Sequence, residues 1–198
     1  MNNSTKIYKS KWIGIFFLLA FIAYGFGRSF FERENTTEQY IGAILILLNT
    51  IMVLFIGVWF KKTLRQYNEM VGNIYFLTRL LEAIALGSIT LNLITTINVS
   101  NDLGYFLAMV ILGIGSIPMC ILLYKHEIAP KWLAMWGVTG YVIFAFGFIM
   151  ELIGKNWSMY LLGLAALWEI TFAIWLIIKG ENEKRLTTRQ HCLRLMFL

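Results

Sequence analysis

Six long apolar stretches, separated by short polar segments, dominate the chain. They run over residues 12–31, 40–60, 73–97, 103–124, 132–153 and 157–178. A helix needs about 20 mainly apolar residues to cross the hydrocarbon core of a bilayer, and each stretch is long enough. Because the connections are short, consecutive helices should be antiparallel neighbours. The pattern predicts an all-α, polytopic transmembrane bundle of six helices within residues 1–180, followed by a basic tail at 181–198.

Composition supports the membrane class and narrows the partners. Hydrophobic residues make up 59% of the 198 residues and charged residues 14%, whereas a soluble domain has about 45–50% and about 25% respectively. These values exclude a water-soluble globule and a disordered chain. The net charge of +6 would suggest nucleic acid only in a soluble chain. We therefore expect the lipid bilayer as a partner and no nucleic acid.

The distribution of basic residues predicts the orientation of the bundle. Of the 17 Lys and Arg residues, 13 fall in the N-terminal segment, the loops at 61–72 and 125–131, and the C-terminal segment from Lys179 onward. All four segments lie on one side of an up-down bundle. The other side holds Arg28, Arg33 and Lys155, while Arg79 lies inside the third stretch. Because basic loops stay in the cytoplasm, we predict that both termini are cytoplasmic.

A few polar residues lie deep inside the predicted helices. Glu82 is roughly 14 Å from the cytoplasmic start of its stretch, and Glu169 is roughly 15 Å from the cytoplasmic end of the last stretch, at about 1.5 Å per residue. Arg79 precedes Glu82 by three positions, which is a facing spacing on a helix. Asn49 lies near the middle of the second stretch. We predict a buried cluster of Arg79, Glu82 and Glu169, with Asn49 at the same level.

Two interpretations of this cluster remain open. Ionisable side chains are costly in hydrocarbon and often mark functional sites. Glu82 and Glu169 would then bind a proton, a cation or an amine in a cavity, with Arg79 tuning their charge. Alternatively, the three residues form a structural salt bridge that fixes the register of the helices. A second polar cluster, Arg28, Glu32 and Glu151, is expected near the outer face, where such pairs are hydrated and ordinary.

The sequence offers little support for catalytic or metal chemistry. Both histidines, His126 and His191, fall in cytoplasmic segments, which argues against haem or zinc inside the membrane. Cys120 and Cys192 lie in different chemical settings, so we do not expect a disulfide. There is no His-Glu-x-x-His motif, nucleophile elbow or phosphate-binding loop. We expect no cofactor, no metal site and no catalytic residue.

Two segments together resemble a known family. In the first, a basic loop ends in Pro130-Lys131-Trp132-Leu133 and leads to Trp136-Gly137. In the second, Glu169 precedes the run Ala173-Ile174-Trp175-Leu176-Ile177-Ile178-Lys179-Gly180. These motifs resemble domain-of-unknown-function family 4386, which comprises small prokaryotic multi-helix membrane proteins. Arg79-Leu80-Leu81-Glu82 resembles the charged patch of the family's middle helix, whereas His126-Glu127 departs from its pattern. The resemblance implies a helical bundle in the prokaryotic cytoplasmic (inner) membrane and implies no activity.

Three functions remain open at this point. The first is a small non-enzymatic binding, sensing or accessory module with a buried Arg–Glu cluster. The second is a small proton-coupled transporter that uses Glu82 and Glu169. Six helices are few for a carrier, so this function implies a homodimer, for which Gly137, Gly140 and Gly147 offer a candidate face. The third is an intramembrane enzyme acting on lipid, which would need a nucleophile–base pair or a metal site.

Overall fold

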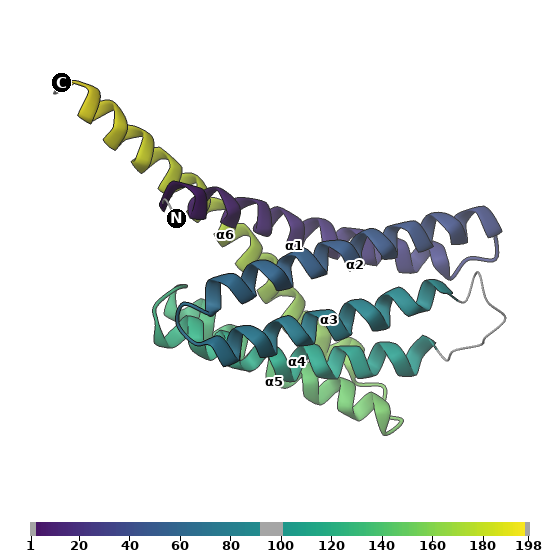
Figure 1. The fold of residues 1–198 in the computed structure, drawn as a ribbon. Coiled ribbons are helices and arrows are strands. Elements are labelled where there is room, and N and C mark those ends of the chain that lie inside the picture. The colour runs from purple at the N-terminus through teal and green to yellow at the C-terminus, as the bar shows by residue number, and fades with distance from the viewer. Residues whose placement is uncertain (1–2, 92–100, 197–198) are drawn as a thin grey trace.

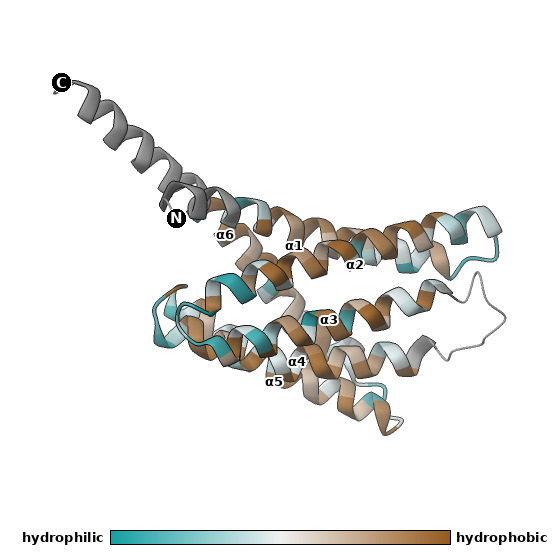
Figure 2. Ribbon diagram, in the orientation of Figure 1, coloured by the Kyte–Doolittle hydropathy of each residue, from teal (hydrophilic) through white to brown (hydrophobic). Residues whose placement is uncertain are grey.

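A computed structural model describes residues 3–91 and 101–196, and this part of the chain is helical. The helices are α1 (Asn3–Phe31), α2 (Thr36–Leu64), α3 (Glu69–Leu91), α4 (Asn101–Lys125), α5 (Lys131–Leu152) and α6 (Ser158–Met196). Each is long and apolar enough to cross a membrane. The predicted six-helix, all-α fold is therefore confirmed. Hydrophobic residues cover the lengths of the helices and hydrophilic residues gather at the connections (Figure 2).

Two of the predicted helix ends, at residues 97 and 178, can be compared with the described residues. The predicted end of the third helix at residue 97 lies outside the described part of the chain. The span of the last helix that is apolar enough to cross a membrane is Tyr160–Lys179, close to the predicted 157–178, and α6 continues beyond it to Met196 as one helix. In Figure 1 this extension projects from the bundle, and the N- and C-terminal ends lie at the same end of the molecule.

The six helices form a closed ring. Among the described residues, each helix packs extensively against two others, in the order α1, α2, α3, α4, α5, α6 and back to α1. Gly14 makes the closing contact possible, because a Cβ at this position would lie 2.5 Å from the carbonyl oxygen of Ala173. Small residues allow such close approach between membrane helices. The ring leaves an interior that is shared by all six helices.

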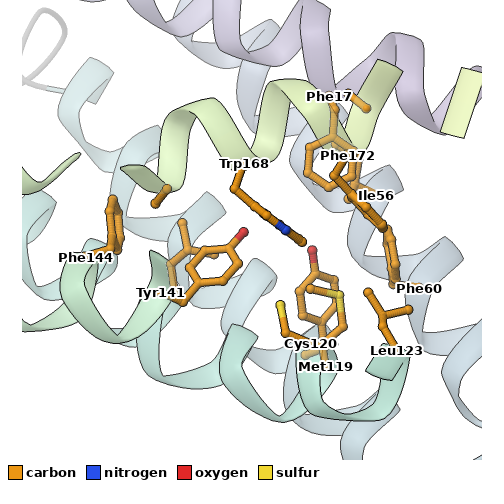
Figure 3. Packing of buried hydrophobic residues seen from close by; sticks show 14 of the residues in the cluster. Phe17, Ile56, Phe60, Met119, Cys120, Leu123, Tyr141, Phe144, Trp168 and Phe172 are labelled. Atoms are coloured by element: carbon orange, nitrogen blue, oxygen red, sulfur yellow. The ribbon is translucent and has the colours of Figure 1, made fainter. Parts of the chain in front are cut away.

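The two ends of the ring differ in charge. We call the end that carries Lys61, Lys62, Arg65, Lys125 and Lys131 the basic end; it holds the α2–α3 and α4–α5 connections. The opposite end holds the α1–α2 and α5–α6 connections. A layer of aromatic side chains fills the interior on the basic side of mid-bundle. Its buried members, most of them labelled in Figure 3, are Phe17, Phe60, Tyr75, Trp168 and Phe172.

Local sequence explains how the helices begin and end. Asn35 caps α2 by accepting a hydrogen bond from the backbone N–H of Thr37 at 3.0 Å. At the end of α4, Glu127 has a positive φ of 50°, and the N–H of Ile128 donates to the carbonyl of Leu123 at 3.0 Å. This hydrogen bond is the mark of a Schellman motif. Helix α4 therefore ends through Glu127, before Pro130 is reached.

The outer surface of the ring is apolar, as a surface in contact with lipid must be. Large hydrophobic side chains around the ring are about half exposed, among them Ile44, Phe55, Ile84, Ile114 and Ile174. In water such a surface would be unfavourable by about 25 cal/mol for each Å² of apolar area. In a bilayer the lipid tails cover it at no such cost. The polar side chains described next face the interior instead.

Candidate functional site

Arg79 and Glu82 form a buried ion pair in the middle of α3. Arg79 Nη1 lies 2.9 Å from Glu82 Oε2, and the two side chains are only 4% and 6% exposed. Arg79 Nε also donates to the hydroxyl of Tyr75 at 2.9 Å. The guanidinium packs over the ring of Phe17, with Cζ 5.6 Å from the ring centroid. These contacts hold a cation in a region where an unpaired charge would be very costly.

A glycine on the neighbouring helix makes room for this arginine. A Cβ on Gly57 of α2 would lie 2.9 Å from the Cβ of Arg79, a distance too short for ordinary packing. The α2 backbone can therefore approach α3 directly at the level of the ion pair. Gly57 thus helps to position Arg79 by leaving space for its side chain. The sequence alone did not indicate this role.

Glu169 of α6 completes the predicted cluster but is held differently. Its Oε1 atom accepts a hydrogen bond from the Tyr141 hydroxyl at 2.7 Å. Arg79 Nη2 lies 3.6 Å from the same oxygen, which is within ion-pair range but longer than a hydrogen bond. The Glu169 side chain is 23% exposed, far more than Glu82. The structure thus brings the three predicted charged residues together and leaves Glu169 the least neutralised of them.

A cavity of about 550 Å³ begins at this cluster and extends away from the basic end of the bundle. Its base includes Arg79, Glu82, Glu169 and Asn49, and its walls come from all six helices. Ligand pockets usually measure about 300–1,000 Å³ and have mostly apolar walls with a few polar groups. This cavity meets both criteria. Asn49 therefore shares the site with the charged cluster, as predicted, although no side-chain hydrogen bond of Asn49 is present among the described residues.

The cavity extends from the cluster to the opposite end of the bundle. Arg28 and Glu32, which form an ion pair one turn apart on α1, line its outer part. Arg28 Cζ lies 6.0 Å from the ring centroid of Tyr105, and Tyr105 stacks on Tyr24 with the centroids 5.9 Å apart. Because Glu32 is 56% exposed, the cavity reaches the surface of the protein here.

Helices α1 and α6 diverge toward the same end (Figure 1). The two helices meet at Gly14 and Ala173, near the basic end. Figure 1 shows α6 running away from α1 toward the opposite end. Gly25 of α1 lines the cavity, and a Cβ at this position would meet nothing within 4 Å. Phe21 of α1 also lines the cavity and is 47% exposed, so the cavity borders the outer surface of the ring as well as its end.

On the basic side of the cluster the interior is filled. Figure 3 shows Phe17, Phe60 and Phe172 packed together, with Phe60 and Phe172 only 2% and 1% exposed. Trp168 stacks on Phe172 at a centroid distance of 4.9 Å. Its indole N–H donates to the Leu133 carbonyl oxygen at 2.6 Å, which ties α6 to α5. This aromatic layer separates the cavity from the basic end.

The predicted outer cluster is only partly assembled as expected. Arg28 and Glu32 pair, but Glu151 accepts a hydrogen bond from the backbone N–H of Ser158 at 3.1 Å. Glu151 therefore holds the first turn of α6, where a carboxylate also interacts favourably with the helix dipole. Arg28 and Glu32 line the cavity, whereas Glu151 is not among its described lining residues.

The glycine face proposed for a dimer is wrong. A Cβ on Gly137 would lie 2.7 Å from the Trp168 ring, and a Cβ on Gly147 would lie 3.1 Å from Cβ of Leu161. Gly140 also faces α6, opposite Ala165. These three glycines are buried between α5 and α6 of one chain. The three glycines do allow a close helix–helix contact, but the partner is α6 of the same chain and not a second subunit.

Sequence reasoning missed one polar residue of the site. Tyr141 supplies the hydrogen bond to Glu169, and it is buried at 1% exposure. The available signal was a tyrosine one position after Gly140 in an apolar stretch, which does not by itself point to Glu169. Tyr75 was more accessible to prediction, because it precedes Arg79 by four positions and so shares its helix face.

The fold and the site together define a class: an integral membrane bundle of six helices with a charged cavity in its interior. Residues 96–180 match the sequence profile of the family described as Domain of unknown function (DUF4386). The match supports the predicted resemblance to this family over α4, α5 and the membrane-spanning part of α6, including Glu169 and Tyr141. No curated protein and no solved structure matches the chain significantly.

Proposed function

We propose that the protein is a non-enzymatic, membrane-embedded binding module whose ligand occupies the cavity above Arg79, Glu82 and Glu169. The observation that carries the proposal is a cavity of about 550 Å³ that is lined by Glu169. The carboxylate of Glu169 belongs to the charged cluster but is partly exposed. A purely structural salt bridge needs no such space beside it. The walls provide apolar and aromatic surface and the base provides charge, which are the components of a binding site.

The proposal includes an orientation. With basic loops in the cytoplasm, the basic end faces the cytoplasm of a prokaryotic cell and both termini lie inside. The cavity then opens toward the extracytoplasmic side of the cytoplasmic membrane, through the region of Arg28 and Glu32. A ligand would reach Glu169 from outside the cell or from the outer leaflet, and the aromatic layer would keep it from the cytoplasm.

Cysteine accessibility tests both parts of this proposal. Ala166 lines the cavity one turn from Glu169, so Ala166→Cys in a Cys120→Ala, Cys192→Ser background places a thiol in the site. In whole cells, external trimethylammonium-ethyl methanethiosulfonate, which does not cross membranes, should label it. Ala173→Cys is the matched control on the same helix, because Ala173 is 0% exposed and lies against Gly14. It should remain unlabelled.

Absence of labelling at position 166 in a folded variant would overturn the proposed access. Labelling only from the cytoplasmic side would instead reverse the orientation and leave the cavity as the site. Folding of each variant is checked by its elution as a single peak in detergent and by its unfolding temperature.

A proton-coupled transporter is the second candidate, and one observation favours it. The cavity is accessible at the opposite end and separated from the basic end by the aromatic layer around Phe60 and Phe172. This arrangement has the form of one state of an alternating-access carrier. Transport would require this layer to open. Proteoliposomes that bind a ligand without moving it across the bilayer would exclude the transporter and retain the binding module.

The homodimer is a separate proposal, and it needs a surface other than the buried glycine face of α5. Native mass spectrometry in detergent tests it directly. A monomer would weaken the transporter function, for which six helices are few, and would leave the binding function unaffected.

A further inference from the structure

The charged residues that line the cavity are unbalanced. In the described part of the chain they are two arginines, Arg28 and Arg79, and three glutamates, Glu32, Glu82 and Glu169. With all five ionised, the cavity carries one excess negative charge. A charge in a low-dielectric site is much more costly than in water. The site is therefore more favourable when a proton or a bound cation supplies the missing positive charge.

The excess charge can be located at one residue. Glu32 is paired with Arg28, and Glu82 lies 2.9 Å from Arg79 Nη1. Among the described residues, Glu169 Oε1 accepts a hydrogen bond from the Tyr141 hydroxyl at 2.7 Å. The same oxygen lies 3.6 Å from Arg79 Nη2. The Glu169 Oε2 atom makes no hydrogen bond or ion pair among the described residues. The Glu169 carboxylate thus has one oxygen available to a ligand that enters the cavity.

The aromatic walls of the cavity favour an organic cation over a metal ion. Phe17, Tyr24, Tyr105, Tyr141 and Phe144 all line the cavity. Aromatic faces attract ammonium groups, by about 0.5–2 kcal/mol for each contact, and they cover apolar ligand surface. A bare metal cation needs several oxygen ligands arranged around it. The described residues contain no group of three His, Cys, Asp or Glu side chains suited to holding a metal ion.

We propose that the ligand is a small organic monocation: an ammonium head that pairs with Glu169 and an apolar body that packs against the aromatic walls. This inference rests on the proposed binding function and adds the chemical class of the ligand. The exposed cavity-lining residue Phe21 marks a side of the cavity at which an apolar body could enter from the lipid phase. Anions are disfavoured, because the cavity lining already holds three glutamates against two arginines.

Three adamantane derivatives test the charge requirement with one apolar shape. The full-length protein is reconstituted in lipid nanodiscs, and its thermal unfolding is measured with adamantylamine, adamantanol or adamantanecarboxylate. At about 100 times its Kd, the amine should raise the unfolding temperature by about 5 °C. The carboxylate should cause no shift, and the neutral alcohol a smaller shift than the amine.

Matched variants assign the effect to Glu169. Glu169→Gln keeps the size of the side chain and an oxygen that accepts from Tyr141, but removes the charge; it should weaken amine binding at least about tenfold. Glu38→Gln is the same chemical change outside the cavity, in a glutamate paired with Arg33 at 3.2 Å. It should retain the wild-type shift. If Glu169→Gln does not fold, Ala166→Trp, which fills the cavity and leaves every charge in place, should abolish the shift instead.

The outcomes separate this inference from the proposed function. Equal shifts with the amine, alcohol and carboxylate, or an amine shift unchanged in Glu169→Gln, would show a ligand site that does not select cations, and only the ligand class would fall. No shift with the amine in a protein whose Ala166→Cys variant is labelled would also overturn the organic monocation. No shift with any probe together with an unlabelled position 166 would overturn the binding function itself.

Discussion

Gly57 of α2 and Arg79 of α3 approach each other so closely that a methyl group on Gly57 would lie 2.9 Å from the Cβ of Arg79. The contact involves the Cβ atom of Arg79, which is fixed by the backbone and cannot rotate away as the end of the side chain could. The guanidinium is fixed beyond this point by Tyr75, Glu82 and the ring of Phe17. The position of the central cation is therefore determined by helix packing as well as by charge.

Gly57→Ala should destabilise the protein by about 1–3 kcal/mol, the usual range for an overpacked core position. Intrinsic helix propensity acts in the other direction, since Ala is favoured over Gly by about 1 kcal/mol in a helix interior. Gly163→Ala is the matched control, because a Cβ there would meet nothing within 4 Å. It should be neutral or stabilising. Chemical unfolding of both variants in detergent micelles measures the difference, and equal stabilities would refute the steric role of Gly57.

Arg79→Met should be among the most damaging single substitutions in the chain. It removes Arg79, the only positive partner of Glu82 in the described part of the chain, and leaves a buried carboxylate, 6% exposed, uncompensated. Breaking a buried ion pair in this way usually costs about 3–5 kcal/mol. The loss should show as a lower unfolding temperature and a reduced yield of folded protein from membranes.

A second substitution distinguishes charge from packing at this site. Arg79→Met combined with Glu82→Gln removes both charges of the pair, so it should be more stable than Arg79→Met alone. Residues in contact are expected to show such non-additivity. If the double variant is as unstable as the sum of the two single variants, the ion pair is not what Arg79 contributes, and its contacts with Phe17 and Tyr75 would be responsible instead.

The depth of the charged residues could be predicted because a helix has a fixed rise. Counting at about 1.5 Å per residue placed Glu82 and Glu169 at one level, and the structure brings both to Arg79. The rotation of each helix about its axis is not determined by its own sequence in the same way. Helix α5 is apolar on all sides, so only its packing against α6 shows that Tyr141 faces Glu169.

The cavity was beyond sequence reasoning for a related physical reason. An interior space is the volume that side chains from six helices fail to fill, and no single helix contains this information. The glycine stripe of α5 failed as a dimer prediction because small residues permit close packing against any helix. Gly137 accommodates Trp168 of the same chain, and a spacing pattern cannot distinguish this partner from a second subunit.

Trp168→Phe should separate the hydrogen bond of this residue from its aromatic packing. The variant keeps a ring beside Phe172 and loses the bond from the indole N–H to the Leu133 carbonyl oxygen, which is 2.6 Å long in the native protein. We expect a loss of about 1–3 kcal/mol, because a buried acceptor loses a partner and a smaller ring fills the site. Trp132→Phe is the control, since Trp132 is 59% exposed and should change the stability by less than about 0.5 kcal/mol.

The α4–α5 connection contains a residue in an unfavourable backbone conformation. Glu127 has a φ of 50°, in the left-handed region that favours glycine. Glu127→Gly and Glu127→Ala both remove the ion pair with Lys131, so their difference reports the backbone alone. The glycine variant should be more stable than the alanine variant by about 1 kcal/mol. Equal unfolding free energies would contradict the assigned conformation.

The same connection offers a pH-dependent measurement outside the membrane-spanning segments. Glu127 accepts a bond from Lys131 Nζ at 2.8 Å, and this hydrogen bond and the charge of Lys131 lower the pKa of Glu127. A lowered pKa means that the carboxylate stabilises the folded state at neutral pH and that this contribution is lost as the pH falls through the folded-state pKa. The contribution is small, because the pair is exposed.

Titration of the Glu127 carboxyl carbon by NMR should therefore give a pKa below the ordinary glutamate range in the native protein. In Lys131→Gln the pKa should return upward to that range, because the hydrogen bond and the charge that lower it are removed. A pKa of Glu127 that is unchanged in Lys131→Gln would show that the ion pair does not form in solution. The end of α4 would then depend on the Schellman hydrogen bond from Ile128 to Leu123 alone.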